Sequence, residues 1–196
     1  MNDRVFFASA LLLAMLLVLL ALQPAAGALP SGSVSGGDTD YTEITVDGRD
    51  LNRIVAGGES RITLIGDGDN RVLRIETEAG ILTDDPVKGP HFRMAADLEN
   101  VFQKQTLEVT VRAKPAARYG AENFIVNYTT GKDGESGWTQ FDMVPQFADY
   151  AFTYKVPPRG TDSGVDFLAI RPVTPEKRRA IEIESITLRP LGYWTD

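Results

Sequence analysis

The sequence has no cysteine and only one histidine among its 196 residues. Without cysteine, the chain can form no disulfide, no thiolate zinc site and no thiol nucleophile. A single histidine also excludes a multi-histidine metal site within one chain. The Gly-x-Ser-x-Gly motif of serine hydrolases is absent as well. These absences favour a protein that is not an enzyme and that needs no cofactor.

Basic residues are fewer than acidic ones, with 20 Lys and Arg against 27 Asp and Glu. The net charge is therefore -7, and the first 28 residues contribute nothing to it because Asp3 and Arg4 cancel. An acidic surface repels phosphate backbones. The charge balance thus argues against a nucleic acid as the partner.

Long hydrophobic runs are absent after the first thirty residues, but one stands at the N-terminus. Val5 to Leu22 holds 18 residues without a charge and is preceded by Arg4. As a helix it would be about 27 Å long, close to the thickness of a bilayer core. Ala26 to Ala28 follow it with the small-x-small pattern of a signal-peptidase site. A cleaved signal peptide and a retained membrane anchor at residues 5–22 are both consistent with this segment.

Either interpretation places the rest of the chain on the far side of a membrane. No Lys or Arg occurs between Arg4 and Arg49, so positive charge lies only before the run. We therefore expect an exported protein, located in the periplasm, on the cell surface or in the medium.

Three segments follow from composition. Residues 1–28 form the signal peptide or anchor. Residues 29–40 (LPSGSVSGGDTD) are rich in Gly, Ser and Asp and predict a flexible linker. Residues 41–196 are expected to form one β-sandwich domain, which is long enough to bury a core without disulfides.

The third segment shows strand signals separated by Gly, Pro and Asp. Thr106 to Arg112 alternates most clearly, with Leu107 and Val109 on one face and Glu108 on the other. A helical turn is expected only near 97–103. Because strands follow strands without intervening helices, the pattern predicts an all-β, antiparallel β-sandwich or barrel. The expected strands are 41–46, 61–65, 71–76, 91–95, 106–112, 123–129, 138–143, 150–156, 165–171 and 181–189.

The second half contains a series of aromatic strands. Trp138 to Phe141 is followed by Pro145 to Asp149, then by Tyr150 to Pro157, Phe167 to Pro172 and Ile181 to Leu188. This series resembles the jelly-roll carbohydrate-binding modules of the galactose-binding-domain-like group, over about residues 70–191. The resemblance implies a jelly roll of eight or more strands. It also implies that a glycan binds on a concave sheet face or in the loops at one end.

Sugar recognition combines aromatic faces with charged or amide groups that bind hydroxyls. If the strands around Arg93, Arg112 and Asn127 were neighbours, one sheet face would carry a polar row; the alternative is an ordinary solvated face. Trp138 and Tyr119 lie in or beside Gly-rich loops; the alternative for Trp138 is packing as a core aromatic at the start of a strand. The candidate ligand-binding residues are Arg93, Glu108, Arg112, Tyr119, Asn127, Trp138 and Arg171.

A weaker candidate is a calcium site. Asp67, Asp69 and Asn70 place three oxygen-bearing side chains within four residues. The segment lacks the spacing and the distal Glu of an EF-hand, and it also fits a plain hairpin turn. A structural calcium ion is thus one interpretation of this turn.

Three hypotheses of function remain open from the sequence. The first is a non-catalytic, exported module that binds a glycan or polysaccharide. The second is a membrane-anchored structural protein that docks other envelope proteins. The third is a small polysaccharide hydrolase or lyase, since paired carboxylates could occur among 27 acidic residues.

Overall fold

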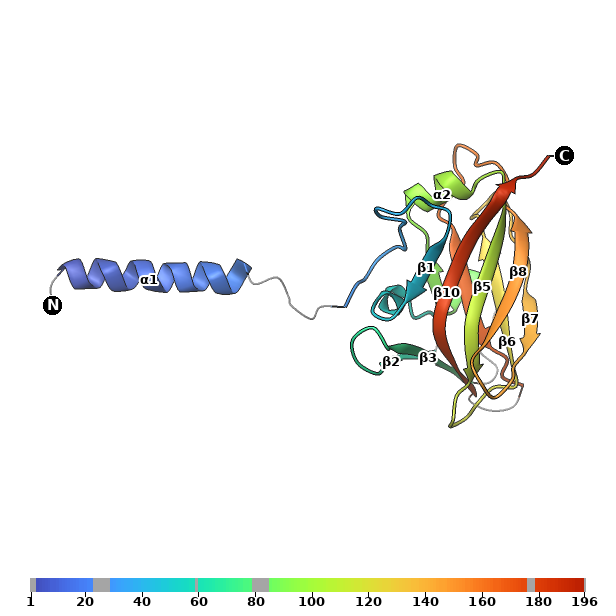
Figure 1. The fold of residues 1–196 in the computed structure, drawn as a ribbon, viewed down its shortest axis with the longest axis horizontal. Helices are drawn as coiled ribbons and strands as arrows, with labels where there is room; N and C mark the ends of the chain where they lie inside the picture. Colours follow the sequence, from blue (N-terminus) through green and yellow to red (C-terminus); the bar gives the residue numbers. More distant parts are fainter. Residues whose placement is uncertain (1–2, 23–28, 59, 79–84, 176–178, 196) are drawn as a thin grey trace.

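A computed structural model describes residues 3–22, 29–58, 60–78, 85–175 and 179–195. Within these residues the chain forms two α-helices and ten strands, and Figure 1 shows one helix standing apart from a β-sandwich. The strands are β1 (Ile44–Asp47), β2 (Arg61–Ile65), β3 (Val72–Thr77), β4 (His91–Arg93), β5 (Gln105–Pro115), β6 (Asn123–Thr129), β7 (Thr139–Asp142), β8 (Ala148–Lys155), β9 (Phe167–Pro172) and β10 (Arg179–Tyr193).

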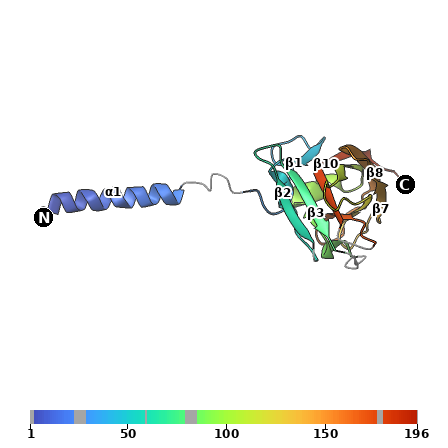
Figure 2. The same ribbon diagram turned by 90° about the horizontal axis from the view of Figure 1, so that it is seen from below.

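The N-terminal helix α1 (Asp3–Leu22) contains the hydrophobic run. In Figures 1 and 2 it lies away from the sandwich. Its apolar side chains, such as Phe7 and Leu12, are exposed. The expected anchor, residues 5–22, falls within α1, and no helix among the described residues is long and apolar enough to cross a membrane. The expected cleavage motif at 26–28 lies outside the described residues.

The sandwich consists of two antiparallel sheets. The larger has the order β2-β3-β10-β5-β8, and β1 pairs with the middle of β10, at Ser185 to Leu188. The smaller has the order β4-β9-β6-β7. Every pairing between these strands is antiparallel, as the alternating patterns require. The prediction of an all-β antiparallel sandwich is therefore confirmed, and each expected strand overlaps an observed one.

The core lies between the inner faces of the two sheets. On β5, Leu107, Val109 and Val111 are fully buried. Phe124 and Tyr128 of β6 are buried opposite them in the same core cluster. Burying a large apolar side chain contributes about 1.5–3 kcal/mol relative to leaving it exposed. The two-residue period of β5 and β6 thus fixes which side chains point outward.

The strand order corrects one expectation from the sequence. Arg93 and Asn127 lie on β4 and β6 of the smaller sheet, whereas Glu108 and Arg112 lie on β5 of the larger sheet. The expected polar row across neighbouring strands is therefore wrong. Alternation gives the face of a residue within its strand, but it does not say which sheet the strand joins.

The segment 29–40, interpreted from the sequence as a flexible linker, packs against the sandwich. Val34 is buried, its N–H donates to the Arg93 carbonyl over 2.7 Å, and its own carbonyl accepts from Ala95 over 2.7 Å. Asp97 accepts hydrogen bonds from Ser35 Oγ and the Gly36 N–H, both at 2.8 Å. The buried Val34 side chain and these hydrogen bonds together hold a segment whose composition otherwise favours disorder.

The expected turn near 97–103 is the short helix α2 (Ala96–Phe102). It buries Leu98 and Phe102 completely. Two 3-10 turns, η1 (Asp50–Arg53) and η2 (Pro86–Lys88), complete the described helical elements.

The alternation of β5 leads to a stability prediction. Leu107→Ala removes a fully buried side chain, so we expect a loss of roughly 2–5 kcal/mol in the free energy of unfolding. Thr153→Ala is the matched control, because Thr153 is exposed on β8 directly beside β5, and it should change stability by less than about 0.5 kcal/mol. Urea unfolding measures both. Equal losses would contradict the assignment of faces.

Candidate functional site

The outer face of the smaller sheet is largely covered, which is unusual for the outside of an antiparallel sandwich. Its outward side chains Asn127, Ala169 and Arg171 are at most 2% exposed. Two segments lie over them: η2 with its flanks, and the loop 130–138 between β6 and β7. A pocket remains where these segments meet the sheet.

Arg171 is held between the two covering segments. Its guanidinium lies 4.4 Å from the ring centroid of Trp138, and Nη2 donates to the Asp85 carbonyl over 2.6 Å. A Cβ at Gly89 would come within 2.6 Å of Arg171 Nε, so any side chain at this position would displace the guanidinium. A desolvated cation–π contact stabilises by about 2 kcal/mol. Arg171 is therefore a positioning residue that fixes Trp138 and η2.

The loop 130–138 is fixed by hydrogen bonds to β6. Asn127 Nδ2 donates to Glu135 Oε2 over 2.9 Å, and Ser136 Oγ accepts from the Tyr128 N–H over 2.9 Å. Glu135 itself is exposed, with its carboxylate held in place by the buried Asn127. A charged acceptor thus stands at the rim of the covered face.

The pocket between the covering segments has a volume of about 340 Å³, and we call it the Phe167 pocket. Phe167 makes an edge-to-face contact with His91 at 5.2 Å, and the Arg93 guanidinium lies 6.0 Å from its ring centroid. Burial lowers the pKa of His91, so its imidazole is neutral near pH 7 and packs as an aromatic. The pocket is lined by Asp85, Pro86, Val87, Thr129, Gly131, Lys132, Gly134, Glu135 and Phe167.

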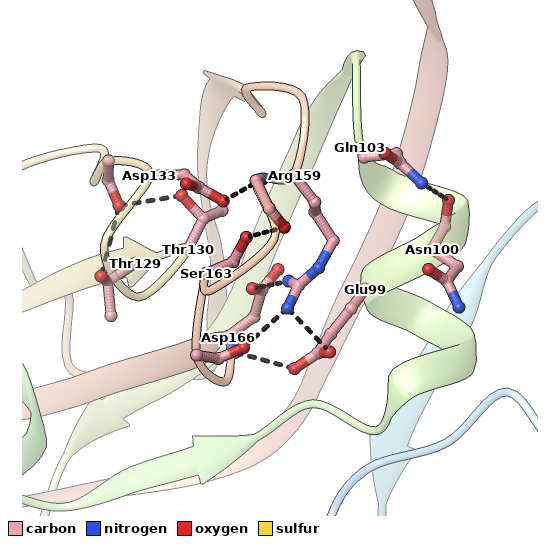
Figure 3. A network of polar contacts seen from close by, with 12 residues as sticks. Glu99, Asn100, Gln103, Thr129, Thr130, Asp133, Arg159, Ser163 and Asp166 are labelled. Atoms are coloured by element: carbon pink, nitrogen blue, oxygen red, sulfur yellow. Dashed lines mark hydrogen bonds and ion pairs between the residues drawn. The ribbon is translucent and has the colours of Figure 1, made fainter.

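A buried ionic network lies directly beneath the start of β9 (Figure 3). Arg159 donates to Asp166 Oδ1 over 2.5 Å and lies 3.1 Å from Glu99 Oε2, so its guanidinium sits between the two carboxylates. Tyr128 Oη donates to Asp166 Oδ2 over 3.1 Å, and the Asp166 N–H donates to Glu99 Oε1 over 2.9 Å. The network joins α2, β6 and β9 at one end of the core.

Burial governs the ionisation of this network. It raises the pKa of Asp166, which is fully buried, while the guanidinium of Arg159 acts in the opposite direction. Burial also raises the pKa of Tyr128 well above its ordinary value, so Tyr128 stays a neutral donor. Asp166 directly precedes Phe167, and neighbouring side chains of an extended chain point to opposite faces. Because the Asp166 carboxylate is held toward the core, the Phe167 ring points outward.

The wall of the pocket at residues 131–134 rests on the segment 157–164. The Lys132 N–H donates to the Ser163 carbonyl over 2.8 Å, and Asp133 Oδ2 accepts from the Gly160 N–H over 3.1 Å. Gly131 has φ 65°, and a Cβ there would lie 2.0 Å from the Ser163 oxygen. Only glycine therefore allows these two loops to approach so closely.

The structure brings four of the seven predicted ligand residues together. Arg93, Asn127, Trp138 and Arg171 all lie on or against the outer face of the smaller sheet. Trp138 is partly buried and packs on Arg171, so it belongs neither to the core nor to a fully open platform.

The other three predicted residues lie elsewhere. Glu108 pairs with Arg189, and Arg112 lies 2.5 Å from Glu184 and 3.1 Å from Asp149, all on the outer face of the larger sheet. Tyr119 lies in the loop after β5.

Sequence reasoning missed Phe167 and Glu135. In Phe167 to Pro172 the strand carries apolar residues on both faces, so alternation gives no sign that Phe167 points outward. Glu135 lies in a Gly-rich loop, and its position depends on Asn127, a contact between residues eight apart. Alternation marks Asn127 and Arg171 as outward polar residues, but their burial is visible only in the structure.

The predicted calcium residues form the turn between β2 and β3. The Asn70 N–H donates to the Asp67 carbonyl over 3.2 Å, which closes the turn. Across the described residues, no group of three or more His, Cys, Asp or Glu side chains could hold a metal ion. The calcium site stays a prediction from sequence.

Comparisons with known proteins show similarity in structure alone. No family model matches the chain, and no curated protein matches it in sequence. The CBM22-2 xylan-binding domain of Xyn10C from Paenibacillus barcinonensis is similar with a TM-score of 0.52 and 12% identity, over 75% of this chain and 98% of that one. An arabinose-bound GH51 α-L-arabinofuranosidase gives a TM-score of 0.51 and 8% identity, over 83% of this chain and 29% of that one.

The chain also spans 26% of the CBM22-1–GH10 portion of xylanase 10B from Clostridium thermocellum, with 13% identity and a TM-score of 0.48. At such identities the likeness concerns the fold. It confirms the predicted resemblance to jelly-roll carbohydrate-binding modules at the level of architecture.

The ionic network leads to a prediction about stability and pH. Arg159→Met leaves Asp166 and Glu99 without their cation, so we expect a loss of about 3 kcal/mol in the free energy of unfolding at pH 7. The pKa of Asp166 then rises further above its unfolded value of about 4. A raised carboxyl pKa stabilises the fold at low pH and loses that effect as the pH rises. The loss should therefore be smaller at pH 5 than at pH 7.

Arg189→Met provides the control, because Arg189 forms an exposed ion pair with Glu108. We expect it to cost less than about 1 kcal/mol, with little change between the two pH values. Urea unfolding at pH 5 and pH 7 gives all the values. If the two variants lose the same stability, Arg159 does not compensate the buried carboxylates.

Proposed function

We propose that this protein is a non-catalytic carbohydrate-binding module that holds a glycan in the Phe167 pocket. One observation carries the proposal: an outward aromatic ring, Phe167, lies in one pocket with the exposed carboxylate of Glu135. Aromatic faces pack on the apolar side of pyranose rings, and charged groups bind hydroxyls through strong hydrogen bonds. A sugar presents both kinds of surface at once.

The rigidity of the pocket supports binding. Glu135 is oriented by the buried Asn127, and the start of β9 is fixed by Asp166 and Arg159. A site that is ordered before the ligand arrives loses less side-chain entropy on binding. The pocket is small and open at the rim, which fits one or two sugar residues of a longer chain better than a deeply enclosed molecule.

The arrangement of carboxylates supports a role without catalysis. A glycosidase needs two carboxyl groups on either side of the scissile bond, with room for the sugar between them. The carboxylates of Glu99 and Asp166 are close together, but Arg159 lies between them and both are buried. This pair stabilises the fold and is closed to a substrate.

The fold suggests which ligand to test first. The structurally similar CBM22-2 domain of Xyn10C is a xylan-binding domain, and a neutral xylo-oligosaccharide is therefore the first ligand for this chain. The hydrophobic N-terminal run, preceded by Arg4, supports the further proposal that the module is exported and meets glycans outside the cytoplasm.

The Phe167 pocket leads to a binding prediction. Phe167→Ala removes the stacking surface, so we expect the Kd for xylohexaose to rise at least about tenfold, or 1.4 kcal/mol. Glu135→Gln keeps an acceptor for Asn127 but removes the charge, and we expect a rise of about fivefold. Isothermal titration calorimetry measures both.

Thr153→Ala, on the outer face of the larger sheet, is the control and should bind as the unchanged chain does. If xylohexaose does not bind, a panel of other neutral glycans replaces it. Binding that survives Phe167→Ala and Glu135→Gln, or no binding to any glycan in the panel, contradicts the proposed site.

A further inference from the structure

A second pocket lies on the opposite side of the sandwich, at the outer face of the larger sheet. It has a volume of about 430 Å³ and is lined by three arginines, one glutamate and one tyrosine. We call it the arginine pocket. Its residues are Arg61 of β2, Arg74 and Glu76 of β3, and Arg118 and Tyr119 of the loop after β5.

Arg74 forms the base of the arginine pocket and is already neutralised. It donates to Glu76 Oε2 over 3.0 Å, lies 3.7 Å from Glu182 Oε1, and donates to the Arg118 carbonyl over 2.8 Å. Glu182 also pairs with Lys114 at 3.3 Å. These contacts fix the loop after β5 against the sheet.

The two remaining arginines stand at the rim. Arg61 and Arg118 are both exposed, and neither has a carboxylate within ion-pair distance among the described residues. Among the described residues, the pocket and its ion-pair partners carry four positive charges and two negative ones: Arg61, Arg74, Arg118 and Lys114 against Glu76 and Glu182. On a chain of net charge -7, a local excess of positive charge attracts an anion to this pocket.

Tyr119 adds an aromatic surface beside these charges. Its side chain is 47% exposed, and its hydroxyl accepts a hydrogen bond from Arg118 Nη2 over 3.0 Å. The Arg118 guanidinium lies 4.8 Å from the ring centroid. The backbone at Tyr119 is held because its carbonyl accepts from the Ala180 N–H over 2.7 Å. The loop therefore presents the ring and the guanidinium as one fixed unit.

We propose that the arginine pocket binds the carboxylate of an acidic sugar, a uronic acid residue within a glycan. The planar forks of Arg61 and Arg118 match a planar carboxylate, and Tyr119 offers a ring on which a pyranose packs. The site lies on the sheet opposite the Phe167 pocket and does not depend on the function proposed for that pocket. A chain with both sites would bind neutral and acidic glycans on opposite faces.

The test measures binding of the full chain to tri-galacturonic acid and to its methyl ester by calorimetry at low salt. The acid should bind at least tenfold more tightly than the ester, which has the same rings without the charge. The double variant Arg61→Gln, Arg118→Gln should reduce the affinity for the acid to that for the ester. Tyr119→Asn, which keeps a residue that tolerates the local φ of 60°, should weaken binding of the acid severalfold.

Two controls separate this site from general charge and from the Phe167 pocket. Arg112→Gln changes an arginine on the same sheet face that is already paired with Glu184 and Asp149, and it should leave the affinity within twofold. Phe167→Ala should also leave binding of the acid unchanged. Equal binding of acid and ester, no binding of the acid, an equal loss in Arg112→Gln, or displacement by equimolar inorganic sulfate would each overturn the proposal.

Discussion

The fully buried carboxylate of Asp166 constrains one whole end of this fold. A buried charge without a partner destabilises the fold by several kcal/mol. Arg159 and Tyr128 remove this cost because both bind the Asp166 carboxylate. Glu99 brings α2 to the same cation, and the Asp166 N–H returns a hydrogen bond to it. Because strand β9 begins at the next residue, the direction of the carboxylate also decides the direction of Phe167. Core electrostatics and the candidate binding surface are thus set by one pair of neighbouring residues.

The outer faces of the two sheets differ in how far other segments cover them. The outer face of the larger sheet carries an ordinary ladder of exposed ion pairs, such as Arg112 with Glu184 and Arg189 with Glu108, which contribute little to stability. The outer face of the smaller sheet is covered by η2 and the loop 130–138, and Arg171 and Asn127 are buried beneath them. Segments that cover a sheet face form the side walls of a shallow pocket, as η2 and the loop 130–138 do here. The segments over the smaller sheet therefore provide the walls of the Phe167 pocket.

Much of the fold could be predicted from the sequence because the two-residue period is a local property. The strands at 61–65 and 123–129 were predicted to the residue. The assignment of strands to sheets was not predictable, since it depends on which loops cross between the sheets. For this reason the sequence leaves open whether Arg93 and Asn127 lie beside Glu108 and Arg112, and the structure has them on opposite sheets. The folding of Val34 onto β4 was equally hidden, because one apolar residue gives no periodicity.

The candidate sites show the same division between local and distant information. Asn127 and Arg171 could be named from alternation, but their burial depends on Glu135 and Asp85, which come from other segments. Tyr119 could be named as an aromatic in a loop, but the three arginines around it come from β2, β3 and the loop itself. In both places a polar group on the outside of a sheet acquires a chemical role only when a second segment folds over it. The outer faces of a sandwich therefore have to be judged by what covers them, and the strand sequence alone records only that they point outward.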